Sequence, residues 1–191
     1  PPPPPPPPPP LFFFTHTPPA AILSGLVGSE MCIRDSCLPH LLNASNPHIL
    51  NISPPLDMDK KWFSGSVAYT IAKFNMSMCV LGMAEEFLGK VAVNALWPRT
   101  AIKTAAVANV LGGGEIYQKS RDPQIMADAA YIILNKEKDK FTGKFVIDDT
   151  ILAEHGETDF RKYCDYPFSE LTPDFFVPDD VYPVPQVVKD S

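Results

Sequence analysis

Three apolar stretches, separated by polar loops, organise the middle of the chain. The first covers residues 48–52 and stops at the Ser-Pro-Pro sequence of residues 53–55, because proline cannot donate a ladder hydrogen bond. The second, residues 66–88, repeats apolar residues at helical spacing and is followed by a glycine. The third, residues 91–97, is a continuous apolar run that ends before Pro98. This order predicts two parallel strands joined by a helical, right-handed crossover.

The sequence on both sides of this unit predicts further elements. Residues 37–42 are typical of the end of a helix, and residues 101–111 of a short helix before a triple glycine that we interpret as a flexible linker. Asp122-Pro123 predicts the start of another helix, and residues 141–148 predict the last strand. The apolar residues at helical spacing in the long helix are Val67, Ile71, Phe74, Met78, Leu81 and Phe87, and those expected to face inward in the later helix are Met126, Ala129, Ala130, Ile133 and Leu134.

Four polar or turn-forming residues are expected to meet at one edge of this sheet. Ligands of open parallel sheets bind beyond the carboxyl ends of the strands. Ser53 closes the first strand, Pro98 follows the second, and the first turns of the long helix hold Tyr69 and Lys73. Tyr69 and Lys73 stand four residues apart and therefore share one face of the helix. We place the candidate functional site at this edge.

Tyr69 and Lys73 form a pair that is suited to proton transfer. A phenol has an ordinary pKa of about 10, and a neighbouring ammonium lowers it by favouring the phenolate. A tyrosine tuned in this way can give a proton to a substrate oxygen or take one from it. The alternative is that the two residues merely share a helix face, since this spacing is frequent by chance.

Four segments in this arrangement resemble the short-chain dehydrogenase/reductase family. They are HILNISPPL (48–56), AYTIAKFNMSMCVLGMAEEF (68–87), VAVNALWPRTAIKTAA (91–106) and FTGKFVIDD (141–149). The resemblance implies the carboxyl-terminal part of an α/β Rossmann-type fold, a doubly wound parallel sheet. No glycine-rich phosphate-binding turn precedes Cys37, so we expect the amino-terminal half of that fold to be missing.

The resemblance also implies a role for each residue at the sheet edge. Tyr69 would be the proton donor or acceptor, and Lys73 would lower its pKa and hold the nicotinamide ribose. A serine at the strand end, here Ser53, would orient the substrate carbonyl. The residues expected to meet the nicotinamide carboxamide, beside Tyr69 and Lys73, are Pro98, the backbone of Ile102 and the hydroxyl of Thr104. Thr104 equally fits a residue of a first helical turn.

Two residues depart from the family pattern. The family's serine usually lies one position after Ser53, where this chain has Pro54, so Ser53 would act through a shifted loop or there is no catalytic serine. Arg99 follows Pro98 where the family usually has glycine. A binding or lipid-handling protein with a degenerate dehydrogenase fold therefore remains the alternative function.

These observations lead to one hypothesis about function. The parent protein is expected to be an NADP-dependent oxidoreductase, with NAD as the alternative, that transfers hydride between its cofactor and a carbonyl or alcohol carbon of a lipid-related substrate. The chain itself is expected to be inactive, because half of the cofactor-binding sheet is missing. The resemblance further implies an intracellular, peroxisomal or mitochondrial protein, although the chain carries no targeting signal. A homo-oligomer through the 66–88 helix is also expected.

Composition separates the two ends of the chain from its middle. The 23 prolines concentrate at the ends. Residues 1–36 resemble a translated homopolymer tract and sequencing adapter, and we exclude them from the fold. Residues 37–165 are expected to form the partial dehydrogenase domain, and residues 166–191 a proline-rich linker.

Charge and the remaining residue types exclude some functions. The net charge of −6, with no basic run, argues against nucleic-acid binding. The apolar stretches of the leader are too short to span a bilayer, and no transmembrane segment is expected. The four cysteines show no metal-binding spacing, so no metal site is expected. A hydrophobic content of 45% in 191 residues is enough for one domain with a core.

Overall fold

The computed structural model describes residues 36–109 and 113–191. It divides into two compact units, residues 1–43 and residues 44–191. The described part of the first unit is a short helix at residues 36–41, which agrees with the predicted helix end. The expectation that residues 1–36 are not native protein sequence concerns, apart from Ser36, residues outside the described part of the chain.

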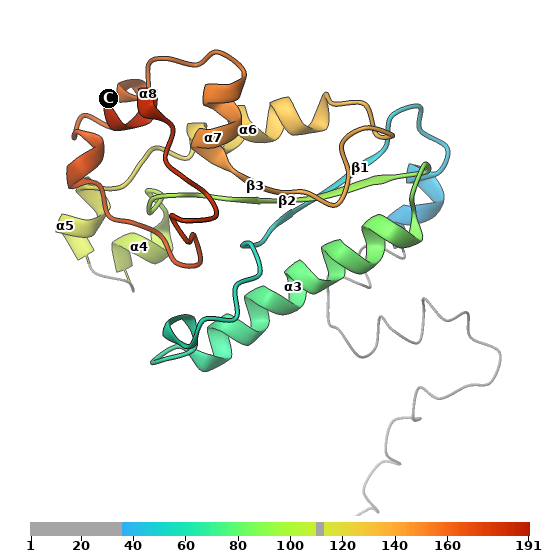
Figure 1. Cartoon of the computed structure of the whole chain (residues 1–191), viewed down its shortest axis with the longest axis horizontal. Coiled ribbons are helices and arrows are strands. Elements are labelled where there is room, and N and C mark those ends of the chain that lie inside the picture. Colours follow the sequence, from blue (N-terminus) through green and yellow to red (C-terminus); the bar gives the residue numbers. More distant parts are fainter. Residues whose placement is uncertain (1–35, 110–112) are drawn as a thin grey trace, which may run out of the picture. The chain divides into compact units, whose positions relative to one another are not determined.

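A three-stranded parallel sheet forms the centre of the second unit. Its order is β1 (His48–Ile52), β2 (Ala92–Trp97) and β3 (Phe145–Ile147) (Figure 1). The first two strands lie where the sequence predicted them, and the α/β class is confirmed. The third strand is shorter than predicted, because residues 141–144 are irregular and Asp148 already begins a helix.

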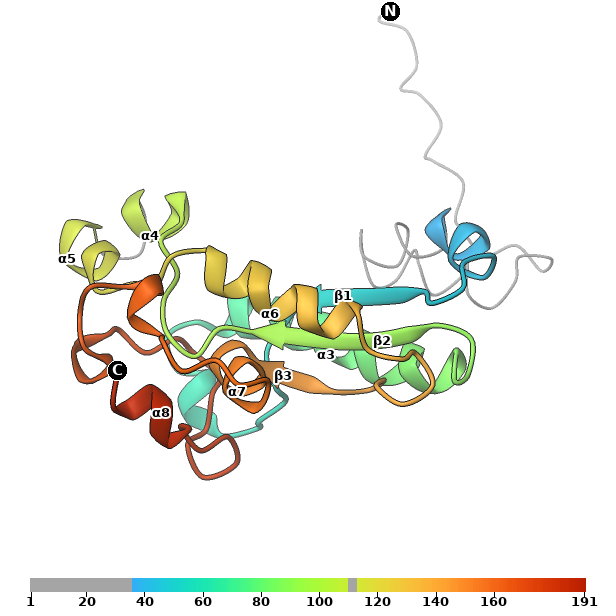
Figure 2. The ribbon, with the colours of Figure 1, turned by 90° about the horizontal axis from the view of Figure 1, so that it is seen from above.

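Helices cover both faces of this sheet. Figures 1 and 2 show α3 (Val67–Glu86) on one face, and α6 (Gln124–Leu134) and α7 (Asp148–Glu154) on the other. The crossover from β1 through α3 to β2 is therefore confirmed. The remaining short elements are η1 (Lys60–Trp62), α4 (Ala105–Asn109), α5 (Gly113–Gln118), η2 (Arg161–Tyr163), η3 (Phe168–Glu170) and α8 (Gln186–Lys189).

Helix α3 turns a different face to the sheet from the one its apolar residues suggest. Of the six apolar residues at helical spacing, only Phe74 and Phe87 are buried, while the other four are 47–58% exposed. The buried face includes the polar residues Thr70 and Ser77. Thr70 donates to the backbone oxygen of Trp62 (2.5 Å), and Ser77 donates to that of Pro54 (2.6 Å). These hydrogen bonds offset the cost of burying the two hydroxyls. The spacing of apolar residues in the sequence could not indicate this buried face, because the acceptors lie in another segment.

Length and apolar composition alone would let α3 cross a membrane. Among the described residues it is the one helix that meets this criterion. A core helix packed on a sheet meets the same criterion, and α3 contacts both β1 and β2.

Two predicted details of the later helices change. Gly113 and Gly114 lie in α5 rather than in a linker, while Gly112 lies outside the described residues. In α6 the buried residues are Ile125, Ala129 and Ile133, and Leu134 is exposed. The buried residues of this short helix are therefore spaced four residues apart. The buried face is turned by part of a helical turn from the face that the sequence predicted.

The segment expected to be a linker, residues 166–191, packs against the rest of the unit. Phe176 and Val188 are both fully buried, one in each of two core clusters. The cluster on the α6 side comprises Leu96, Ile102, Ile125, Ala129, Ile133, Ile151, Leu152, Phe160, Tyr163 and Val188. The other comprises Phe74, Trp97, Ile147 and Phe176. The high proline content suggested a linker. The segment packs instead, because the apolar residues between its prolines reach the core.

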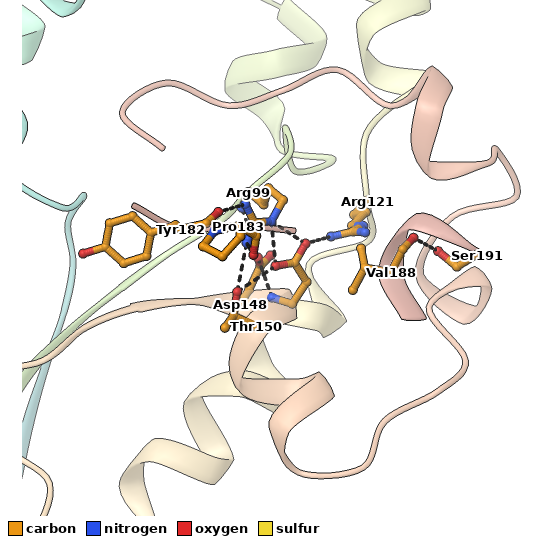
Figure 3. Close-up of polar contacts among 9 residues, drawn as sticks. Arg99, Arg121, Asp148, Thr150, Tyr182, Pro183, Val188 and Ser191 are labelled. Carbon is orange, nitrogen blue, oxygen red and sulfur yellow. Dashed lines mark hydrogen bonds and ion pairs between the residues drawn. The ribbon is translucent and has the colours of Figure 1, made fainter. Parts of the chain in front are cut away.

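A buried cluster of four charged residues joins the sheet to this carboxyl-terminal segment (Figure 3). The Nε atom of Arg99 donates to both carboxylate oxygens of Asp149 (2.8 and 2.9 Å), and Arg121 donates to the same carboxylate (3.1 Å). Arg99 also donates to the backbone oxygen of Tyr182 (2.8 Å). Its backbone nitrogen donates to Asp148 (3.0 Å). Arg99 therefore fixes the end of β2, the start of α7 and the carboxyl-terminal segment together.

Aromatic rings and a raised pKa accompany this cluster. The guanidinium of Arg121 lies 5.8 and 5.6 Å from the ring centroids of Phe160 and Phe168, within cation–π range, while its Nε and Nη2 have no hydrogen-bond partner among the described residues. Burial, together with the adjacent charge of Asp149, raises the pKa of the Asp148 carboxyl above its ordinary range. Proton uptake by Asp148 accordingly stabilises the folded chain as the pH falls through that raised pKa.

We predict that Asp149→Ala destabilises the chain by about 3–5 kcal/mol, because it leaves two buried guanidinium groups without their carboxylate. Urea unfolding followed by circular dichroism measures this loss. Glu115→Ala, which removes the exposed ion pair with Lys119, is the matched control and should change stability by less than about 1 kcal/mol. Equal, small losses in both variants would contradict the role given to the cluster.

Candidate active site

The structure brings the predicted residues of the site to the carboxyl ends of β1 and β2. Lys73 Nζ lies 3.5 Å from the backbone oxygen of Ile52, the last residue of β1. The same atom lies 6.0 Å from the centroid of the Tyr69 ring and 5.2 Å from that of Trp97, the last residue of β2. The ammonium of Lys73 therefore sits between the two strand ends and the tyrosine, as the sheet topology requires.

Tyr69 is half exposed and stands against the carboxyl-terminal segment. Its ring stacks on Phe176, with 6.0 Å between centroids and 23° between planes. Partial burial and the negative charge of Asp174 raise the pKa of Tyr69 above its ordinary value. The sequence predicted a lowered pKa from Lys73. The difference arises first from the partial burial of Tyr69, which disfavours the charged phenolate, and then from the negative charge of Asp174, which belongs to the segment that was taken for a linker.

Asp174 is a site residue that the sequence did not indicate. Burial raises the pKa of its carboxyl to about 6, against the opposing effects of the backbone N–H of Phe175, which donates to it at 2.6 Å, and of the Lys73 charge. The carboxyl is mostly ionised at neutral pH and carries a proton in mild acid. An aspartate after a proline in a proline-rich tail gave no signal of this role.

Ser53 lies at the end of β1, as predicted, but inside the molecule. It is 0% exposed, and its hydroxyl has no hydrogen-bond partner among residues 36–109 and 113–191. Next to it, the Pro54 oxygen accepts the Ser77 hydroxyl, which fixes the loop that follows the strand. A buried hydroxyl without a hydrogen-bond partner lowers the stability of the fold by about 1–3 kcal/mol, so a serine with a purely structural role is unfavourable at this position. Its catalytic role remains a prediction.

The residues predicted to meet a nicotinamide follow β2 directly. Pro98 and Ile102 are buried, and the backbone oxygen of Ile102 accepts a hydrogen bond from Thr104 N (2.7 Å). The Thr104 hydroxyl accepts from the backbone nitrogen of Val107 (3.3 Å) and so caps α4. Thr104 therefore lies directly before the first turn of α4, close to the position that the alternative gave it. Its exposed hydroxyl still has a proton to donate to a carboxamide oxygen.

A cavity of about 510 Å³ opens on the other side of Asp174. Trp62 and Lys61 of the loop before α3 line it, together with Arg99, Thr100, Asp174 and Val177. Two residues of the loop at residues 58–63 thus border this cavity. No group of three or more metal-ligating side chains occurs within the described ranges.

Comparison with known proteins gives close relatives that extend beyond this chain. Hydroxysteroid dehydrogenase-like protein 2 of Danio rerio is 58% identical over 141 residues, which are 74% of this chain and 34% of the relative. The chain therefore spans about a third of the length of the curated relatives that it matches. No protein-family model matches the chain.

Solved structures give the same relationship. A short chain dehydrogenase from Mycobacterium thermoresistibile superposes with a TM-score of 0.69 at 43% identity, over 81% of this chain and 54% of that one. A Shigella flexneri protein of the short chain dehydrogenase type, complexed with NADP, shares the fold with a TM-score of 0.51 at 18% identity, over 62% of this chain and 49% of that one. The three-stranded parallel sheet thus matches part of the Rossmann fold of these enzymes. The chain is a close homologue of hydroxysteroid dehydrogenase-like protein 2, of which it covers about a third, and its structural neighbours are short-chain dehydrogenases.

Proposed function

We propose that this chain carries the proton-transfer residues of an NADP-dependent oxidoreductase that moves hydride between its cofactor and a carbonyl or alcohol carbon. The observation that carries the proposal is the position of the Tyr69–Lys73 pair, with Lys73 Nζ 3.5 Å from the last carbonyl of β1. This position beyond the carboxyl ends of parallel strands is where open α/β sheets bind their ligands. A lipid-related carbonyl compound is the substrate class that the resemblance favours.

The residues after β2 fit the nicotinamide half of such a cofactor. The exposed Thr104 hydroxyl has a proton to donate, and the Lys73 ammonium lies beside the strand end that the ribose would approach. The cofactor would supply or accept the hydride. The NADP in the Shigella flexneri structure supports the choice of cofactor, with NAD as the alternative.

Tyr69 would move the proton that accompanies the hydride. In the reducing direction its hydroxyl donates to the substrate oxygen as negative charge develops there, and in the oxidising direction the phenolate takes the proton back. Lys73 would favour the phenolate by its positive charge and hold the ribose. The half-exposed position of Tyr69 leaves its hydroxyl open to a substrate.

A chimera tests this function, because the chain alone is expected to show no turnover. Residues 37–191 replace the matching segment of the Danio rerio relative, and NADPH oxidation is followed with a panel of aliphatic aldehydes and ketones. Tyr69→Phe should lower kcat by about 100-fold or more, the usual contribution of a positioned acid or base, with the Kd for NADPH unchanged. Unchanged turnover in Tyr69→Phe would favour the non-catalytic binding role, and NADPH oxidation by the 191-residue chain alone would overturn its expected inactivity.

The role of Ser53 can be measured in the same chimera. If its buried hydroxyl meets the substrate oxygen when the loop shifts, Ser53→Ala should lower kcat at least tenfold, or about 1.4 kcal/mol of barrier. Ser77→Ala is the matched control, since it also removes a buried hydroxyl near this loop. That hydroxyl donates to the backbone oxygens of Pro54 and Lys73. A smaller effect in Ser53→Ala than in Ser77→Ala would remove Ser53 from the site.

We also propose that α3 forms the interface of a homo-oligomer. Val67, Ile71, Met78 and Leu81 remain about half exposed on its outer face. From residue 67 to residue 84 the helix carries no charged side chain other than Lys73, which lies toward the strand ends. A long uncharged face can pair with itself about a two-fold axis, and such a contact buries the exposed apolar side chains.

Sedimentation velocity tests this interface. The chain should sediment as a dimer, and Ile71→Glu combined with Met78→Glu should raise the dimer dissociation constant at least tenfold, because two charges enter an apolar contact. Tyr131→Glu changes an even more exposed hydrophobic residue, on α6, and serves as the control. A monomeric unsubstituted chain, or equal effects of the α3 and α6 substitutions, would contradict the proposal.

A further inference from the structure

The ring of Phe176 packs against the rings of both Tyr69 and Trp97. It stacks on Tyr69 with 6.0 Å between centroids and 23° between planes, and its centroid lies 6.1 Å from that of Trp97. Phe176 is fully buried, whereas Tyr69 is 46% exposed. Phe176 therefore covers one face of the tyrosine ring from inside the molecule, and the rest of the tyrosine stays open to a ligand.

The Tyr69 ring depends on packing for its orientation. Its hydroxyl forms no hydrogen bond within residues 36–109 and 113–191, and Phe176 is the one aromatic ring of these residues that packs on it. The ammonium of Lys73 lies 6.0 Å from the centroid of the tyrosine ring, at the outer limit of cation–π range. We therefore expect the stack with Phe176 to select how this ring is turned about its side-chain bonds.

The same part of the chain also fixes the ring that faces Lys73. The Nζ atom of Lys73 lies 5.2 Å from the centroid of the Trp97 ring. That indole packs on Phe176, and its Nε1 donates to the backbone oxygen of Phe175 (2.8 Å). Two adjacent residues, Phe175 and Phe176, accordingly contact both Tyr69 and the indole beside the lysine.

The backbone of Phe176 is held in an unusual conformation. Its φ of +70° is left-handed, which is uncommon for a residue other than glycine. Such a conformation persists only where the surrounding structure imposes it, and it is often found at functional sites. Here the backbone nitrogen of Asp174 donates to the oxygen of Arg99 (2.9 Å), and Thr100 forms an antiparallel bridge with Pro173. These contacts fix the chain just before Phe176 to the residues that follow β2.

We propose that Phe176 is a positioning residue for the Tyr69–Lys73 pair: its ring stacks on the tyrosine and packs on the indole that faces the lysine. The inference deepens the proposed function and rests on it for the roles of Tyr69 and Lys73. Proton transfer needs the tyrosine hydroxyl within hydrogen-bond reach of the substrate oxygen, and a displacement of about 1 Å can lower the rate roughly 100-fold. Loss of the Phe176 ring should therefore slow the chemical step without weakening cofactor binding.

The chimera with the Danio rerio relative tests this role with two leucine substitutions. Phe176→Leu removes the ring but keeps an apolar side chain, and it should lower kcat about tenfold or more with the Kd for NADPH unchanged, because Tyr69 can leave its productive orientation. Phe160→Leu makes the same change at a similarly buried ring of the other core cluster. It should change kcat only through the amount of folded protein, which circular dichroism measures. Equal kcat values per folded molecule in the two variants overturn the proposal.

The proposed function and the positioning role fail in different ways. Full turnover in Tyr69→Phe overturns the proposed function, and the role of Phe176 in the reaction with it. A large loss of turnover in Tyr69→Phe, together with equal kcat values in Phe176→Leu and Phe160→Leu, overturns the positioning role alone.

A measurement without a substitution at residue 176 decides the question if Phe176→Leu does not fold. In the 191-residue chain, the ring protons of Tyr69, assigned by their loss in Tyr69→Phe, should show nuclear Overhauser effects to phenylalanine ring protons. Tyr131, which is 72% exposed and forms no ring contact within the described ranges, should show none. Absence of any such effect at Tyr69 overturns the proposal, because Phe176 is the ring that packs on it. This measurement involves no turnover, so its outcome does not depend on the activity of the chimera.

Discussion

The contact between Arg99 and Asp149 is the interaction on which the arrangement of the site depends. It joins Arg99, which follows β2, to the first turn of α7. The same guanidinium donates a hydrogen bond to the backbone oxygen of Tyr182. Removal of Asp149 leaves two buried guanidinium groups without their carboxylate, which costs far more than the intact contact contributes. The side chain of Arg99 thus gives the position after Pro98 contacts with two distant segments.

The site is accordingly built from segments that are far apart in the sequence. The strand ends and α3 supply Lys73 and Tyr69, while the carboxyl-terminal segment supplies Phe176 and Asp174. The first set places a tyrosine and a lysine at the carboxyl ends of two parallel strands, where the resemblance led us to expect them. The second set packs a ring against that tyrosine and, after burial, contributes a negative charge that raises its pKa. The site therefore combines a locally placed pair with contacts from a distant segment.

The sequence predicted most of the local structure and little of the long-range structure. β1, α3 and β2 follow from apolar runs and prolines, and the Tyr69–Lys73 pair follows from helical spacing. The buried face of α3 could not be predicted, because Thr70 and Ser77 become suitable for burial only through carbonyls of a separate loop. Arg99 and Asp174 also escaped prediction, since each acquires its surroundings from a segment 50 or more residues away in the chain.

The burial of Phe176 has a consequence for the order in which the molecule can form. Tyr69 and Phe176 are separated by more than half of the chain, so the ring stack belongs to the contacts of greatest sequence separation. Such contacts form late, because a long loop must close first. During synthesis the strand–helix–strand unit leaves the ribosome well before Phe176 does, and in that interval Tyr69, Trp97 and Phe74 lack their common partner. Premature termination or proteolysis upstream of residue 176 would leave the chain permanently in that unfinished state, with an aromatic surface open to chaperones.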